Sequence, residues 1–428
     1  MSEDQIRSLP GTEDFMPDGW AHRRTLYREA ARQFALYGYG ELHTPIIEDT
    51  RLFVKGTGET TDIVEKQMYS IPSAEGEGIT LRPEGTPSAV RAYLEKNLHK
   101  QEPFQKFWYA GPMFRKERPQ KGRLRQFHQI GVEAIGSSSP LLDAETLLLA
   151  VEILRAAGLT KLRVLVNSIG CPACRPVYRD ELRRRLKART GELCEDCRRR
   201  LERNVLRVLD CKNEGCHRVA GELPGPGEFL CETCRDHWTQ FRAALQACKI
   251  DCEEDPRLVR GLDYYTRTVY EIKHEGLGAR DTICGGGRYD GLVEELGGPP
   301  TPCVGFAIGV EATLLAMEAE LGPAPDSSPR PSVFVVCFEK SGLGRCFELV
   351  RALRAAGVSA EMDYEARSAK AQMRRANRLG SPYCLLIGRE ELEKSEILIK
   401  SMADGAQWKA AWAEGPAEIR RAMEPPRK

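Results

Sequence analysis

The chain has 428 residues, of which 41% are hydrophobic, so it is long enough for two or three domains with packed cores. Its 63 Lys and Arg residues nearly balance its 62 Asp and Glu residues and leave a formal net charge of +1, which excludes a protein held to nucleic acid or membrane by overall charge. The first ten residues, MSEDQIRSLP, lack the apolar core of a signal peptide, and no apolar run is long enough to span a membrane. We therefore expect a cytoplasmic protein without a membrane partner.

The N-terminal part of the chain predicts a mixture of helices and strands. Helical spacing of apolar residues covers residues 20–37 and 140–157, and residues 82–98 predict a turn that leads into a helix. Strands are expected at 41–49, 104–115, 127–136 and 162–167. The strands at 104–115 and 127–136 are joined by the polar loop KERPQKGRLRQ.

Residues 171–250 differ from their surroundings because they contain close cysteine pairs and long Arg-rich helical stretches. After them, strand patterns return in LDYYTRTVYEIKH, CGGGRYDGL and CVGFAIGVEATLLAM, which are residues 262–274, 284–292 and 303–317. GPAPDSSPRP, residues 322–331, has the composition of a linker.

Beyond this linker, strand and helix patterns alternate. Strands are expected at 333–338, 359–364 and 383–388, and helices at 343–357 and 369–380. Such alternation predicts an α/β unit with a mostly parallel sheet.

The stretch FRKERPQKGRLRQFHQIGVE, residues 114–133, contains six Lys or Arg residues and only two acids. A solvated hairpin is the simpler interpretation of such a charge run. However, Arg115 lies within the strand pattern with Glu117 two residues on, and Gln129 shares a face of the next strand with Glu133. Inward-pointing polar groups are costly unless they bind something polar, so the alternative is a polyphosphate site covered by the loop.

Three further segments carry residues suited to ligand binding. TLRPEGTPSAV places Glu84 and Thr86 at a helix start, where a plain capping turn is an equally good interpretation. VRGLDYYTRTVYEI places Arg260 before the paired tyrosines Tyr264 and Tyr265, which could also be core residues. The glycines of CGGGRYDGL let a backbone approach a flat ligand, but neither this spacing nor any other here is that of a Rossmann fold or a P-loop.

Together these segments resemble the histidyl-tRNA synthetase family of class II aminoacyl-tRNA synthetases. The resemblance covers nearly the whole chain and depends on the order and spacing of LRPEGT, FRKERPQKGRLRQFHQIGVE, RGLDYYTRTVYE, and CGGGRYDGL followed by GFAIGVE. It implies an α+β catalytic domain over residues 1–321 with a six- to seven-stranded antiparallel sheet. It also implies a helical Cys-rich, basic insertion at 171–250, a linker at 322–331 and a C-terminal α/β anticodon-binding domain at 332–428.

The resemblance further implies an activity: ATP-dependent ligation of L-histidine to tRNA(His) through a histidyl-adenylate, with release of AMP and pyrophosphate. Mg²⁺ would accompany ATP. A homodimer is expected, because the first motif of the family, here around ELHTPIIEDTRLF, builds the dimer interface.

Individual residues acquire roles through the same resemblance. Arg115 and Arg260 would be the catalytic cations on opposite sides of the ATP α-phosphate, with Glu117 at the adenine end and Arg123 at the outer phosphates. The histidine pocket would contain Glu84, Thr86 and Gln129 around the α-amino group, and Glu133, Tyr264, Tyr265 and Tyr289 around the imidazole. One position departs from the family pattern: Ala312 stands where class II enzymes usually carry an Arg that contacts the terminal phosphate.

The chain has fifteen cysteines, and eight of them form close pairs within the insertion. Two zinc sites would use all eight as ligands, namely Cys171, Cys174, Cys194, Cys197, Cys211, Cys216, Cys231 and Cys234. Reduced thiols without a metal are the alternative, and the sequence does not decide which pairs would share an ion.

The insertion is also basic, since residues 182–209 contain ten Lys or Arg against four acids. These cations could contact the acceptor stem of tRNA or simply face solvent.

Two other functions are compatible with parts of the sequence. A non-catalytic paralogue, such as the regulatory subunit of ATP phosphoribosyltransferase, would explain Ala312 but would be expected to lack RGLDYY and an anticodon-binding domain. A zinc-ribbon RNA-binding protein would explain the insertion but not the polar residues of the strands.

Overall fold

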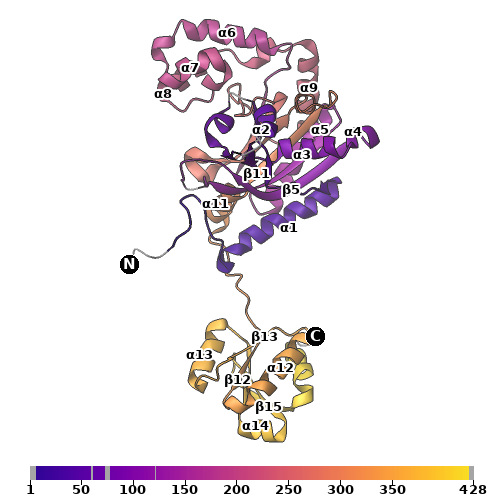
Figure 1. Cartoon of the computed structure of the whole chain (residues 1–428), viewed down its shortest axis with the longest axis vertical. Coiled ribbons are helices and arrows are strands. Elements are labelled where there is room, and N and C mark those ends of the chain that lie inside the picture. The colour runs from indigo at the N-terminus through magenta and orange to yellow at the C-terminus, as the bar shows by residue number, and fades with distance from the viewer. Residues whose placement is uncertain (1–5, 59–60, 73–77, 121, 424–428) are drawn as a thin grey trace. The chain divides into compact units, whose positions relative to one another are not determined.

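The computed structural model describes residues 6–58, 61–72, 78–120 and 122–423 (Figure 1). The chain divides into two compact units, Met1–Asp326 and Ser327–Lys428, with the boundary inside the linker segment 322–331. Among the described helices, none combines the length and apolar character needed to cross a membrane.

An eight-stranded sheet forms the centre of the first unit, with the order β1-β5-β6-β11-β10-β9-β7-β8. The strands are β1 (Gly40–Glu41), β5 (Gln105–Phe114), β6 (Gln126–Ile135), β7 (Leu162–Ser168), β8 (Glu253–Glu254), β9 (Thr266–His274), β10 (Thr282–Arg288) and β11 (Cys303–Gly309). The six strands from β5 to β7 run antiparallel to their neighbours, whereas the two-residue edge strands β1 and β8 pair in parallel. The expected six- to seven-stranded antiparallel sheet is therefore corrected to a mixed, eight-stranded one, because two-residue strands leave no alternating pattern in a sequence.

The two faces of this sheet carry different side chains because strand residues alternate between faces. On β6, Ile130, Val132 and Ala134 join the main apolar core, and the same core takes Tyr270 and Ile272 from β9. The helices that cover this face are α1 (Trp20–Tyr37), α5 (Pro140–Ala156), α9 (Glu232–Ala247) and α11 (Val310–Leu321). The odd-numbered residues of β6, including Glu133, are left for the opposite face.

The opposite face is covered by α3 (Thr86–Glu95) and α10 (Leu292–Glu295) together with the insertion, which share a second apolar core. Beside it lies a small sheet of β2 (Ile47–Asp49), β4 (Ile79–Leu81) and β3 (Tyr69–Ile71), with α2 (Thr50–Thr57), η2 (Ile63–Gln67) and α4 (Leu98–Gln101). Short helical turns complete this unit at η1 (Pro17–Gly19) and η6 (Glu275–Arg280).

Several predicted elements of this unit are confirmed and three need correction. The helix at 20–37 has the predicted bounds and ends at Gly38, whose φ of +74° suits glycine. The expected strand at 41–49 is wrong, because a break that contains Pro45 divides it into β1 and β2. The strand expected from residue 262 begins only at Thr266, and residues 310–317 belong to the helix α11.

The insertion is helical, as predicted. Its elements are α6 (Arg175–Lys187), η3 (Thr190–Glu192), α7 (Glu195–Arg203), η4 (Val205–Val208), α8 (Glu214–Gly221) and η5 (Pro226–Phe229), followed by α9. The helices α6, α7 and α8 lie together (Figure 1) and bury Leu182, Leu186 and Leu201 among other apolar residues.

The second unit is an α/β structure with the strand order β13-β12-β14-β15-β16. Its elements are β12 (Val333–Cys337), η7 (Lys340–Gly342), α12 (Leu343–Ala355), β13 (Ala360–Met362), α13 (Ala369–Leu379), β14 (Tyr383–Ile387), α14 (Arg389–Lys394), β15 (Glu396–Ser401), β16 (Gln407–Ala411), η8 (Trp412–Glu414) and α15 (Gly415–Met423). The first three strands of this unit, β12, β13 and β14, are parallel, as expected, but β15 and β16 add an antiparallel hairpin that the sequence analysis missed.

A buried ion cluster ties helix α5 to the end of β10. Asp143 and Arg288 are both fully buried, and Arg288 Nε donates to Asp143 Oδ1 at 3.0 Å. His237 Nε2 lies 2.8 Å from Asp143 Oδ2, and Asp290 also pairs with Arg288. A buried guanidinium that loses its main partner is strongly destabilising.

We therefore expect Asp143→Ala to lower the free energy of unfolding by about 3–5 kcal/mol, since among the described residues Asp290 is then the one acid that pairs with Arg288, beside the Ser137 and Ser139 carbonyls. Urea denaturation followed by tryptophan fluorescence would measure the change. The matched control is Glu253→Ala, because Glu253 pairs with Arg163 on the surface and its loss should cost less than about 0.5 kcal/mol. Equal effects of the two substitutions would contradict the contribution to stability that is assigned to the buried ion cluster.

Candidate active site

A pocket with a volume of about 120 Å³ lies on the face of the central sheet away from α1 and α5. Most of the predicted ATP- and histidine-binding residues line it: Glu84, Thr86, Arg115, Gln129, Arg260, Tyr264, Tyr265 and Tyr289. They come from the turn before α3, the end of β5, strand β6, the segment before β9 and the residue after β10. Residues from five places in the sequence thus converge on one site.

Glu133 forms the floor beside this pocket and is almost completely buried. Its Oε1 accepts hydrogen bonds from Thr86 Oγ1 at 2.7 Å and from the Tyr109 hydroxyl at 3.1 Å, and its Oε2 accepts one from the Tyr289 hydroxyl. A side chain on Gly305 of β11 would overlap the Glu133 carboxylate, so glycine is required there. Burial raises the pKa of Glu133 to about 8, although the three hydroxyl donors oppose that rise.

Glu84 is a second buried carboxylate, on the wall of the pocket. Its Oε2 accepts a hydrogen bond from the Tyr264 hydroxyl at 2.9 Å, whereas its buried Oε1 has no hydrogen-bond partner among the described residues. The buried Oε1 of Gln129 likewise has none in the described part of the chain. Two unsatisfied acceptors that line one pocket indicate a ligand with N–H donors. Burial raises the pKa of Glu84 to about 7, against the lowering effect of Arg115 and Tyr264.

Two guanidinium groups line the same pocket. Arg115 follows the last residue of β5, which corrects the expectation that the strand contains it, and its Nε donates to the Pro83 carbonyl at 2.9 Å. Arg260 pairs with Glu271 of β9 and lies over the ring of Tyr265, 5.9 Å from its centroid. A side chain on Gly285 would overlap the Arg260 guanidinium, which explains one of the glycines of CGGGRYDGL.

The other two predicted ATP-binding residues do not line the pocket. Glu117 is buried and pairs with Arg123, with 2.7 Å between Glu117 Oε2 and Arg123 Nε. Gln120 and Arg123 exchange backbone hydrogen bonds of 3.0 and 2.8 Å. In this structure the loop therefore holds the Arg123 guanidinium against Glu117 and away from the pocket.

The sequence analysis missed two residues of the site. Tyr109 lines the pocket and donates to Glu133, and Glu271 holds Arg260 while accepting a hydrogen bond from Thr282 Oγ1 at 3.0 Å. Strand alternation could have identified Tyr109, because it lies six residues before Arg115.

Ala312 lies in the first turn of α11, half-buried against the main apolar core. Its neighbour Glu311 accepts hydrogen bonds from the backbone N–H of His128 at 2.9 Å and lies 2.8 Å from His128 Nδ1. Position 312 therefore contributes packing, and any cation for a terminal phosphate must come from elsewhere.

The cysteines of the insertion gather into two groups of four. One contains Cys171, Cys174, Cys231 and Cys234, and the other contains Cys194, Cys197, Cys211 and Cys216. Within each group the sulfur atoms all lie within 4.8 Å of one another. The structure thus combines the first cysteine pair with the fourth and the second with the third.

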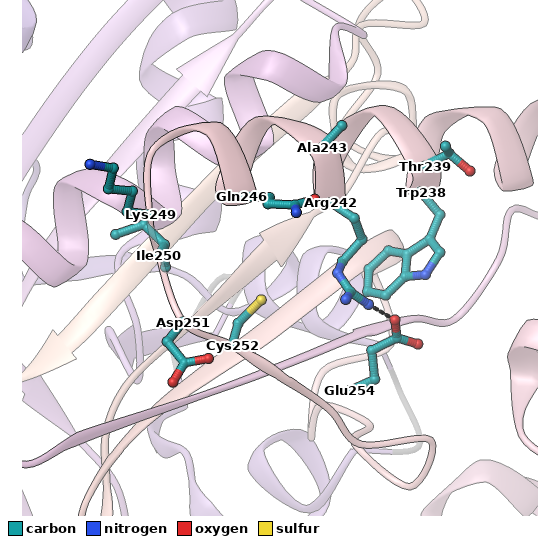
Figure 2. A pocket seen from close by; sticks show the side chains of 10 residues that line it. All are labelled: Trp238, Thr239, Arg242, Ala243, Gln246, Lys249, Ile250, Asp251, Cys252 and Glu254. Carbon is teal, nitrogen blue, oxygen red and sulfur yellow. Dashed lines mark ion pairs between the residues drawn. The ribbon is translucent and has the colours of Figure 1, made fainter.

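A larger pocket, of about 780 Å³, lies at the end of α9 and contains none of the predicted site residues. Figure 2 shows Arg242 of this pocket between Trp238 and Glu254. The guanidinium pairs with Glu254 and lies 5.8 Å from the Trp238 ring centroid. Because Arg242 is already paired and no unsatisfied buried acceptor lines this pocket among the described residues, it is a weaker candidate for the active site.

The chain is similar over most of its length to proteins of one family. A family model described as histidyl-tRNA synthetase matches residues 11–313, and one described as an anticodon binding domain matches residues 332–422. The chain belongs to the histidyl-tRNA synthetase family. A curated relative from Halothermothrix orenii, named histidine–tRNA ligase, is 46% identical over 94% of this chain and 96% of its own length.

One solved structure supports the same assignment, and a more distant one shows the same fold. The apo crystal structure of S. aureus histidyl-tRNA synthetase is 34% identical, covers 97% of this chain and 100% of its own, and aligns with a TM-score of 0.80. A Bacillus halodurans structure with a title that names both an ATP phosphoribosyltransferase regulatory subunit and a histidyl-tRNA synthetase aligns with a TM-score of 0.63. At 20% identity over 90% of this chain, that similarity shows only a common fold.

Proposed function

We propose that this chain ligates L-histidine to tRNA(His) in two steps, through a histidyl-adenylate, and releases pyrophosphate and AMP. The observation that carries the proposal is a single pocket that combines two unsatisfied acceptors, a buried carboxylate with tyrosines and two guanidinium groups, in a chain of this family. Near full-length similarity to histidine–tRNA ligases and the match to an anticodon-binding domain favour the enzyme over the regulatory-subunit alternative.

Histidine would bind with its α-ammonium group at Glu84 and Gln129. Both residues line the pocket and have a buried oxygen without a hydrogen-bond partner in the described part of the chain, and an ammonium group supplies three donors. Thr86 lies beside them but already donates to Glu133, so it would link the amino-group subsite to the imidazole subsite.

The imidazole ring would lie against Glu133 and the three tyrosines. Tyr264 packs on Tyr265 with 4.7 Å between ring centroids, and Tyr289 meets Tyr264 edge to face at 5.5 Å. Glu133 and Tyr265 would each hydrogen-bond one ring nitrogen. An apolar amino acid of similar size would leave these buried groups unpaired, so selection against it should be strong.

Adenylation needs charge neutralisation more than proton transfer. The histidine carboxylate that attacks the α-phosphorus is ionised at neutral pH, so a general base is unnecessary. Arg115 and Arg260 would hold the α-phosphate from two sides, and Mg²⁺ bound with ATP would neutralise further phosphate charge. Glu117 would contact the adenine end, and Arg123 would leave Glu117 to reach the terminal phosphate and so compensate for Ala312.

The tRNA would contact the insertion and the C-terminal unit. Most cations of residues 182–209 pair with nearby acids, as Arg189 does with Glu192 and Glu222. Exposed pairs of this kind contribute little stability, so RNA phosphates can replace their carboxylates at low cost. A homodimer in the cytoplasm, and zinc in the insertion, complete the proposal.

The decisive experiment is ATP–pyrophosphate exchange by the purified chain with each of the twenty amino acids in turn. Exchange with histidine alone is expected, and it would show that Ala312 does not prevent adenylation. Histidine binding without exchange would favour the regulatory-subunit alternative instead.

The pocket also predicts a pH dependence. The pKa of Glu84 is raised to about 7 by burial, so its carboxylate becomes protonated as the pH falls through 7 and loses its attraction for the α-ammonium group. We expect kcat/KM for histidine to fall below pH 7 in the native chain. In Glu84→Gln, kcat/KM should be low already at pH 8 and should not show the fall that Glu84 causes below pH 7.

The imidazole of the substrate also titrates, with an ordinary pKa of about 6.5. This effect is common to both proteins, so the difference between their profiles reports the titration of Glu84. Stopped-flow or steady-state exchange from pH 5.5 to 9 would measure both profiles. Parallel profiles for the two proteins would show that Glu84 does not bind the amino group in its ionised form.

A further inference from the structure

The insertion contains two groups of four cysteines, and we propose that each group binds one zinc ion. The first, the base site, consists of Cys171, Cys174, Cys231 and Cys234, and the second, the inner site, of Cys194, Cys197, Cys211 and Cys216. The first and last cysteine pairs of the insertion thus enclose the other two.

The spacing of the sulfur atoms fits a tetrahedral zinc site. With Zn–S bonds of about 2.3 Å, the edges of a tetrahedron of sulfurs are about 3.8 Å long. In the base site, Cys171 Sγ lies 3.7 Å from Cys174 Sγ and 3.9 Å from Cys231 Sγ, and Cys174 Sγ lies 3.8 Å from Cys234 Sγ. In the inner site, Cys194 Sγ lies 3.9 Å from Cys211 Sγ. A disulfide would require about 2.05 Å.

The surrounding backbone suits thiolates. Cys174, Cys194 and Cys231 are the N-caps of α6, α7 and α9, and Cys216 lies in the first turn of α8. Positive helix ends therefore meet at both sites and stabilise negative sulfur. Backbone N–H groups also donate to sulfur, from Cys171 to Cys174 and from Cys194 to Cys216, both at 3.1 Å.

Packing of reduced thiols explains the base site less well. Among the described residues its small apolar cluster contains only Leu230 besides the cysteines, and Cys171 and Cys231 are only partly buried. By contrast, Cys284 and Cys303 are buried singly within the large apolar cores, where a thiol acts as a small apolar side chain. Three cysteines of the inner site also belong to the second apolar core, so the spacing of the four sulfurs and the helix ends carry the assignment of that site.

The base site adjoins the proposed histidine pocket, and this part of the inference rests on the proposed function. Arg175 follows Cys174 directly, and its guanidinium donates to the backbone carbonyl of Tyr265. Just before the site, Ile169 N donates to Arg267 O at 2.8 Å and Arg267 N donates to Gly170 O at 2.9 Å. Zinc at the base site would therefore hold the segment that carries Tyr265.

The inner site is connected to the pocket less directly, through the second apolar core and through Asp263, the residue before Tyr264. Its neighbourhood meets the rest of the first unit through Arg207, which pairs with Asp62 at 2.7 Å, and through Asn204, which donates to Asp263 at 2.8 Å. Loss of the inner ion should disturb the insertion, and hence the transfer to tRNA, more than histidine binding.

Metal analysis of the full-length purified chain tests the proposal without reference to activity. Two equivalents of zinc per chain are expected, one for each group of four cysteines. Cys174→Ser and Cys216→Ser should each retain one equivalent, and Cys248→Ser, which changes an exposed cysteine outside both groups, should retain two. If a serine variant fails to fold, replacement of zinc by Co²⁺ in the native chain should still give thiolate-to-cobalt absorption with the band shape of tetrahedral four-sulfur sites.

Metal-free native protein that is folded and has titratable thiols would overturn the proposal, as would a Co²⁺ spectrum without thiolate bands. Measurement of KM for histidine distinguishes the two sites. Cys174→Ser should raise this KM about 10-fold or more, and Cys216→Ser should leave it within about 3-fold of the native value. Equal KM values with normal zinc stoichiometry would overturn only the link to Tyr265. Absence of exchange in native protein that contains zinc would overturn the proposed function and leave the metal sites intact.

Discussion

Replacement of Arg260 by alanine should lower histidine-dependent ATP–pyrophosphate exchange by about 10³-fold while the dissociation constant for histidine changes little. The guanidinium lines the pocket with Arg115 and is positioned by Glu271, by the ring of Tyr265 and by the absence of a side chain at Gly285. Its proposed partner is the ATP α-phosphate, which gains additional negative charge as the histidine carboxylate attacks it. Exchange kinetics and calorimetric titration with histidine would measure the two effects.

Two variants make this test specific. Arg260→Lys keeps the charge but not the planar fork of donors, so it should recover part of the activity. Arg242→Ala removes an arginine that is also paired with a glutamate and also lies over an aromatic ring, but in the larger pocket (Figure 2), and it should leave exchange unchanged. A loss of less than 10-fold in Arg260→Ala, or an equal loss in Arg242→Ala, would contradict the role of Arg260.

Glu133→Gln should lower kcat/KM for histidine by about 10²-fold or more and should also make the protein more stable at alkaline pH. Glutamine keeps the shape of the side chain but cannot ionise to the carboxylate that would face an imidazole N–H. The carboxylate is buried beside Tyr109, Tyr289 and Thr86, and burial raises its pKa from the model-compound value of 4.5 to about 8. Histidine recognition therefore depends on a buried carboxyl group whose ionised form lowers the stability of the folded chain.

The loss of folding stability caused by the burial of Glu133 increases with pH. Between pH 4.5 and 8 the folded chain binds the Glu133 proton more tightly than the unfolded chain does, so stability declines as the pH rises through this window. Glutamine does not titrate, so the excess stability of Glu133→Gln should be small at pH 5 and reach a plateau above pH 8. Thermal unfolding at pH 5, 7 and 9 would measure it.

Tyr289→Phe is the matched control, because it removes one hydroxyl donor to Glu133 and keeps the charge and the ring. It should reduce kcat/KM by only about 10-fold, and it should raise the pKa of Glu133 further, which deepens the decline in stability with pH. If Glu133→Gln retained near-native kcat/KM, the assignment of Glu133 to the imidazole would be wrong.

Local pattern predicted much of the fold because periodicity records which face of an element is buried. The helix at 20–37 was bounded correctly by its apolar spacing and Gly38, and the strands that became β5 and β6 were found from alternation. Alternation also placed Gln129 and Glu133 on one face of β6, and that face borders the pocket. Elements too short to show a period, such as β1 and β8, could not be predicted, nor could the hairpin of β15 and β16.

The candidate site was predicted as a set of residues, but not as a set of contacts. Tyr109 of β5 donates a hydrogen bond to Glu133 of β6. Glu271 of β9 pairs with Arg260, which lies before that strand, and Arg123 is held by Glu117 rather than presented to the pocket. The convergence of the site residues depends on the strand order β5-β6-β11-β10-β9, which joins segments that are far apart in the chain.

The sequence by itself determined the chemistry available to this protein: three arginines, three carboxylates, three tyrosines and eight paired cysteines, in an order that resembles one enzyme family. Only the tertiary structure decided that Cys171 and Cys174 meet Cys231 and Cys234, and that burial gives Glu84 and Glu133 raised pKa values. The physical reason is the same in both cases. Residue type and spacing fix what a side chain can bind, whereas its neighbours and its exposure to water depend on how distant segments pack.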